Sequence, residues 1–155
     1  MDKRQLSDVI ETAIRREEEA YDFYMDLHGR FDDAQVQEAL AWIAGEEKKH
    51  KAFLVDYRDG RLGPDALQLR HAVDYKVAEY LDEPEVSDHM ARHEVFLVAA
   101  HREKRAHDFY SALADHHPDG EVAGMLRRMA SEEMRHKEKM EYLYANAAFP
   151  QTDGG

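Results

Sequence analysis

The sequence predicts an all-α protein, a single domain built as a bundle of four long helices. Charged residues make up 35% of the 155 residues and hydrophobic residues 43%, a balance that suits long amphipathic helices around one core. Apolar residues recur at helical spacing in four blocks of roughly 25 residues each. The prolines all lie outside these blocks, at Pro64, Pro84, Pro118 and Pro150.

The four predicted helices cover residues 5–28, 33–57, 87–114 and 119–146. Gly29 is expected to end the first, because glycine favours the position after a helix. Short connections follow the first and third helices, so each joins two antiparallel neighbours. The long connection between the second and third is expected to contain a short helix around residues 72–81. Two hairpins joined by a long crossover make a ferritin-like bundle, predicted over residues 1–149, with residues 150–155 as a flexible tail.

The two predicted hairpins have similar sequences. A shift of 86 residues aligns residues 9–51 with residues 95–137 without a gap, and seventeen aligned positions are identical. Shared helical composition does not produce that many identities. The sequence therefore predicts a duplicated helical hairpin.

One motif, Glu-Glu-x-x-His, occurs once in each copy, as "EEKKH" at 46–50 and "EEMRH" at 132–136. Its second glutamate and its histidine are three residues apart, so they share a helix face, and that face is the apolar inner one. In the first helix of each copy a single glutamate also interrupts the inner face. Six side chains are therefore expected to meet at the centre of the bundle: Glu17, Glu47, His50, Glu103, Glu133 and His136.

Four buried carboxylates and two imidazoles predict a site for two divalent metal ions. A buried carboxylate without a partner costs several kcal/mol, and neighbouring carboxylates raise one another's pKa. Metal ions remove both penalties. Two Glu-x-x-His helices facing two helices with one glutamate each form the ligand set of di-iron and di-manganese carboxylate bundles. These ligands suit iron, manganese or zinc, and the chain has no cysteine to contribute a thiolate.

The stretches "AIRREEEAYDFY", "EEKKH", "AAHREKRAHDFY" and "EEMRH" resemble, in this order, the ferritin-like domain of the rubrerythrin family. The resemblance covers nearly the whole chain. It implies a non-haem di-iron site that reduces hydrogen peroxide or oxidises ferrous iron. The implied roles are bridging for Glu47 and Glu133, ligation of one iron for Glu17 and His50, and ligation of the other iron for Glu103 and His136.

Two features depart from the family pattern. Rubrerythrins typically add a Cys-rich rubredoxin domain, whereas these residues include no cysteine, so an external electron donor such as a rubredoxin-type protein is expected. Rubrerythrins also have a second glutamate three residues after the ligand of the third helix. Here Ala106 follows Glu103 at that distance, which leaves a symmetric ligand set closer to that of bacterioferritin.

Charge and hydropathy narrow the choice of partners. The net charge of -12 disfavours nucleic acid and anionic membrane surfaces. No apolar run or N-terminal signal segment predicts membrane insertion or export. We therefore expect a soluble, cytoplasmic homodimer that reacts with hydrogen peroxide or dioxygen. The alternatives are a non-catalytic helical module with structural zinc or manganese, and a component that acts inside a larger assembly.

Overall fold

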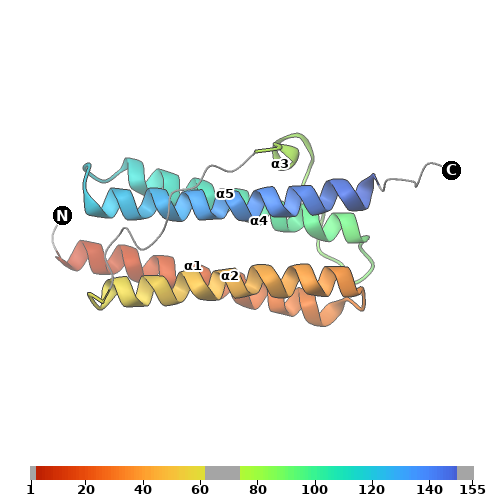
Figure 1. Ribbon diagram of the computed structural model, residues 1–155, viewed down its shortest axis with the longest axis horizontal. Helices are drawn as coiled ribbons and strands as arrows, with labels where there is room; N and C mark the ends of the chain where they lie inside the picture. Colours follow the sequence, from red (N-terminus) through yellow and green to blue (C-terminus); the bar gives the residue numbers. More distant parts are fainter. Residues whose placement is uncertain (1–2, 62–73, 150–155) are drawn as a thin grey trace. The chain divides into compact units, whose positions relative to one another are not determined.

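The computed structural model describes residues 3–61 and 74–149. In these ranges it contains no strand and five helices: α1 (Lys3–Arg30), α2 (Ala34–Arg58), α3 (Val77–Tyr80), α4 (Arg92–Asp115) and α5 (Glu121–Ala148) (Figure 1). The structure divides into two compact units, an N-terminal unit with α1 and α2 and a C-terminal unit with α3, α4 and α5. The predicted all-α class is confirmed, with the two long hairpins and the short crossover helix of a ferritin-like protein.

In the N-terminal unit, α1 packs along α2 as the predicted hairpin (Figure 1). The Asp33 carboxylate caps α2 by accepting hydrogen bonds from the backbone N–H groups of Gln35 and Val36. The prediction that Gly29 ends the first helix is wrong, because α1 continues to Arg30. A salt bridge of 3.0 Å between Arg30 and Asp26 spans that last turn and supports it.

The buried apolar residues of this unit follow the predicted helical spacing. On α1 they lie on one helix face, with the buried Glu17 between Ile14 and Tyr24, and α2 contributes a matching row. They include Ile10, Ala13, Ile14, Tyr24, Leu27, Val36, Leu40, Ile43 and Leu54. The two rows define the inner face on which the polar side chains discussed below also lie.

In the C-terminal unit, α4 packs along α5 as the second predicted hairpin. The predicted start of its first helix at residue 87 is wrong, because α4 begins at Arg92. The reason is a local cap, in which the Glu94 carboxylate accepts a hydrogen bond of 2.9 Å from the backbone N–H of Ala91. The core of this unit includes Val95, Phe96, Val98, Ala99, Tyr110, Met125, Leu126, Met129 and Met140.

The crossover helix is shorter than predicted in the part of the chain that the structure describes. Residues 72 and 73 of the predicted helix, and the predicted tail at 150–155, lie outside the described residues. Lys76 has a positive φ of 55°, and its backbone N–H donates to the Asp74 carboxylate at 2.9 Å. This turn takes the place of a first helical turn, so α3 covers only Val77–Tyr80.

Among the described residues, no helix combines the length and the apolar character that crossing a bilayer requires.

Candidate metal centre

Three of the predicted ligands belong to the N-terminal unit, and the structure brings them together. Glu17 lies on α1, while Glu47 and His50 lie one turn apart on α2. All three are buried, with 2%, 2% and 3% of their surface exposed. His50 Nδ1 is 3.7 Å from Glu17 Oε1, and the ligand atoms of the three residues lie within 4.8 Å of one another. We call Glu17, Glu47 and His50 the N-terminal ligand set.

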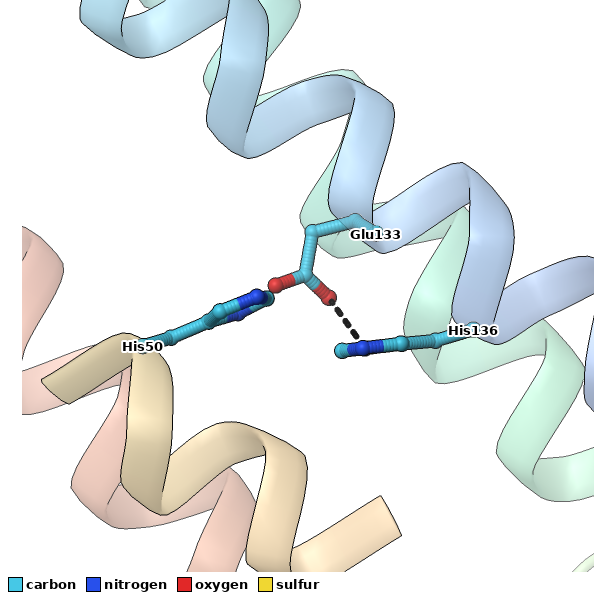
Figure 2. A group of neighbouring side chains, drawn as sticks. All are labelled: His50, Glu133 and His136. Carbon is cyan, nitrogen blue, oxygen red and sulfur yellow. Dashed lines mark ion pairs between the residues drawn. The ribbon is translucent and has the colours of Figure 1, made fainter. Parts of the chain in front are cut away.

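The C-terminal unit contains the equivalent three residues in an equivalent arrangement. Glu103 lies on α4, and Glu133 and His136 lie on α5. His136 Nδ1 is 3.5 Å from Glu103 Oε2 and 3.7 Å from Glu133 Oε2. Figure 2 shows Glu133 and His136 projecting from the same helix, with the ion pair between them marked. Glu103, Glu133 and His136 form the C-terminal ligand set, and all three are buried.

The apolar pattern of each helix explains which glutamate of the Glu-Glu-x-x-His motif is a predicted ligand. The second glutamate lies on the core face, and the first does not belong to the ligand set. Ile43 and Leu54, on either side of Glu47 and His50 along α2, are fully buried, so the ligand face is the core face. The preceding glutamate points elsewhere. In α2, Glu46 pairs with Lys49 at 3.5 Å; in α5, Glu132 pairs with Arg135 at 3.2 Å.

The geometry of each set fits a metal ion. Two ligand atoms that each lie about 2.1 Å from one zinc ion are at most about 4.2 Å apart. The nitrogen-to-oxygen distances of 3.5 to 3.7 Å lie within that limit. They are also longer than an ordinary N–H···O hydrogen bond of about 2.9 Å. Carboxylate oxygen with imidazole nitrogen is a donor combination for iron, manganese and zinc. Each unit therefore holds a three-residue group suited to a divalent metal ion, while one centre shared by all six residues stays a prediction.

The sequence analysis missed a buried charge cluster next to the C-terminal ligand set. Lys137, which follows His136, is completely buried. Its ammonium Nζ lies 2.6 Å from Asp74 Oδ1, 3.0 Å from Glu79 Oε1 and 3.2 Å from Glu141 Oε2. We call these four residues the Lys137 cluster. It ties the crossover segment and α3 to α5.

A sequence signal for the Lys137 cluster exists, but it is weak. Lys137 aligns with Lys51 in the repeat, which suggests equivalent roles, whereas buried Glu141 aligns with Val55 and so breaks the repeat. Glu141 also accepts a hydrogen bond of 3.0 Å from the backbone N–H of Ala78 in α3. The glutamate at position 141, where the other copy has Val55, was the available indication of the Lys137 cluster.

The electrostatics of the Lys137 cluster favour its charged state. Burial by itself disfavours the charged form of Asp74, but hydrogen bonds from Lys137 and from the Lys76 backbone outweigh it and lower the pKa of Asp74. Burial likewise opposes the charge of Lys137, and hydrogen bonds to Asp74, Glu79 and Glu141 outweigh it and raise the pKa of Lys137. The ammonium is therefore charged near neutral pH despite its burial.

We expect Lys137→Met to lower the free energy of unfolding by about 3 kcal/mol at pH 7, because it leaves the buried carboxylate of Glu141 without its cation. The equivalent change Lys51→Met is the control, since Lys51 pairs with Glu18 at 3.1 Å and both side chains are nearly half exposed. It should cost less than about 1 kcal/mol. Urea unfolding of the two variants and the unmodified chain measures both values.

The difference between Lys137→Met and the unmodified chain should also depend on pH. The folded pKa of Asp74 lies below its unfolded value of about 3.9. The stabilisation is therefore present above that unfolded value and is lost as pH falls through the folded pKa. Equal losses in the two lysine variants, or a difference that persists in strong acid, would contradict this account of the cluster.

Comparison with known protein families identifies a matching family model. The family model described as Rubrerythrin matches residues 8–88 and 94–153 of the chain. The matched ranges contain both ligand sets. No curated protein and no solved structure matches the chain significantly.

Proposed function

Because the chain belongs to the rubrerythrin family, we propose that it is a non-haem di-iron oxidoreductase that reduces hydrogen peroxide. Family membership and the buried glutamates and histidines together indicate a metal-binding protein of the di-iron class. The observation that supports the finer proposal is the duplication of the ligand set, since each hairpin supplies two buried carboxylates and one buried imidazole. Two equivalent sets suit two equivalent metal ions.

In this proposal the N-terminal and C-terminal ligand sets act together at one di-metal centre. Glu47 and Glu133 would serve both ions, Glu17 and His50 would hold one ion, and Glu103 and His136 would hold the other. The four carboxylates balance the four positive charges of two divalent ions. That balance explains why six ionisable side chains are compatible with a buried position.

Two bound ferrous ions would supply the two electrons that convert hydrogen peroxide and two protons into two water molecules. The protein contributes geometry and exclusion of water. His50 and His136 lie on the long helices α2 and α5, which hold the imidazoles in fixed positions. The carboxylates of Glu47 and Glu133 can bind through one oxygen or two, and so accommodate a change in metal charge. Burial of both ligand sets limits the amount of water around the ligand atoms.

Oxidation of ferrous iron by dioxygen or peroxide is the related activity of the same proposed centre. An external electron donor is part of the proposal, because none of these 155 residues is a cysteine that could hold a thiolate-bound iron centre. The homodimer and the cytoplasmic location expected from the sequence stay predictions.

Metal loading tests the proposal directly. We expect the metal-free chain to bind two ferrous ions per chain under anaerobic conditions and to unfold at a higher temperature afterwards. Free metal at about 1,000 times its dissociation constant adds about 4 kcal/mol to the free energy of unfolding. Anaerobic titration and calorimetry with and without a chelator measure both quantities. Retention of zinc in preference to iron, with no reaction of the iron-loaded chain with peroxide, would favour the structural alternative.

A further inference from the structure

A pocket of about 340 Å³ in the N-terminal unit reaches one of the predicted metal ligands from the surface. Its lining consists of Glu17, Glu18, Tyr21, Asp22, Lys48 and Lys51. Glu17 is buried, whereas Glu18, Asp22 and Lys48 are exposed. The pocket therefore extends from exposed side chains to the buried residue Glu17.

The lining of this pocket is charged. Its lining contains three carboxylate side chains, of Glu17, Glu18 and Asp22, and two ammonium side chains, of Lys48 and Lys51. Glu18 Oε1 on α1 and Lys51 Nζ on α2 form a salt bridge of 3.1 Å that joins the two helices. Both side chains are nearly half exposed, and salt bridges of that kind contribute little to stability.

The two copies of the repeat share the predicted metal ligands but differ in residues that line this pocket. Glu17 and its equivalent Glu103 are both retained, but Glu18 is replaced by Lys104 and Lys48 by Met134 in the second copy. Lys104 pairs with Asp108 at 2.9 Å on its own helix.

The remaining cation of the lining also differs between the copies. Lys51 lies at the pocket, whereas its equivalent Lys137 is buried and held by Asp74, Glu79 and Glu141. Both copies keep the ligands, yet the charges around them differ. The charges that line the pocket are therefore not fixed by the ligands that both copies share.

We propose that this pocket is the route by which a divalent cation reaches Glu17, with the Glu18–Lys51 salt bridge controlling passage. This inference rests on the proposed metal-binding function. The carboxylates of Glu18 and Asp22 raise the local concentration of cations, and Glu17 receives the ion at the buried end. Lys51 opposes passage by its charge and by occupying the Glu18 carboxylate.

Two substitutions that break the same salt bridge with opposite changes in charge test the route. Lys51→Gln removes the opposing cation and should speed uptake of Co²⁺ by about threefold. Glu18→Gln removes the attracting carboxylate, leaves Lys51 in place and should slow uptake by about threefold. Stopped-flow absorbance of the cobalt-loaded protein gives the rate, and its final amplitude gives the amount bound, which should be the same in all chains.

A third variant controls for overall charge. Lys104→Gln changes the net charge by the same amount as Lys51→Gln. Lys104 lies in the C-terminal hairpin, at the position equivalent to Glu18, and so it is not part of the pocket. This variant should therefore leave the rate of Co²⁺ uptake unchanged. The opposite effects of the first two variants should shrink as salt is added, because the Debye length is about 10 Å at 0.1 M.

The outcomes distinguish failure of the proposed cation route from failure of the proposed metal-binding function. If both salt-bridge variants shift the rate in the same direction, or if Lys104→Gln matches Lys51→Gln, the route is wrong while metal binding stands. If the unmodified chain takes up no Co²⁺, no Fe²⁺ and no other divalent ion, the proposed function itself is wrong.

Discussion

Glu47→Gln and Glu133→Gln should each weaken metal binding by about 100-fold or more, and by comparable amounts. Both side chains are buried, and each belongs to a ligand set with the same composition. Glutamine keeps the size of the side chain but removes the negative charge that a divalent ion requires. Losing even a hydrogen-bond partner of a metal ligand typically costs 10- to about 100-fold, so loss of a proposed ligand carboxylate should cost at least the upper value.

The adjacent glutamates supply matched controls for this prediction. Glu46 and Glu132 have the same residue type in the same helices and motifs, but they pair with Lys49 and Arg135. Glu46→Gln and Glu132→Gln should change the affinity by less than about threefold, since neither glutamate belongs to a ligand set. Competition with a coloured chelator ranks all four variants. If Glu47→Gln abolishes binding while Glu133→Gln does not, the centre is mononuclear or asymmetric, and the two sets do not act together.

The reduced, iron-loaded chain should consume one hydrogen peroxide per pair of ferrous ions and then stop. The reaction takes two electrons from the metal pair and delivers them, with two protons, to the peroxide. None of the 155 residues is a cysteine, so these residues provide no thiolate-bound iron centre that could return the electrons. We expect turnover to resume when a rubredoxin-type donor and its reductase are added, at least tenfold above the rate without them.

Stoichiometric peroxide titration of the anaerobic protein, followed by ferric absorbance, measures the single oxidation. Peroxide consumption with the donor, with its reductase alone and with neither then isolates the donor's contribution. The Glu133→Gln variant serves as a control for iron bound elsewhere on the acidic surface, because it should show no stoichiometric phase. Continued peroxide loss without any reductant would contradict the prediction and would indicate disproportionation, the reaction expected of a dimanganese centre.

Helix class, hairpin pairing and the membership of each ligand set followed from local periodicity and from the repeat. A residue three positions after Glu47 must share its helix face, and buried Ile43 and Leu54 fix that face as the inner one. The same reasoning applied to the second copy placed His136 beside Glu133, as the structure shows. Helix ends were less predictable. Gly29 did not end α1, and the cap formed by Glu94 moved the start of α4 to Arg92.

The sequence by itself determined what depends on spacing along one helix: the all-α class, the two hairpins and the ligands that each contributes. Only the tertiary structure decided which charges meet across long separations. Lys137 contacts Asp74 and Glu79, 63 and 58 residues away, because the crossover segment passes over α5. Its repeat equivalent Lys51 pairs with Glu18 beside the pocket instead. Helical periodicity assigns a residue to a face, but the path of the connecting chain determines what covers that face. The same lysine is therefore buried in one copy and nearly half exposed in the other.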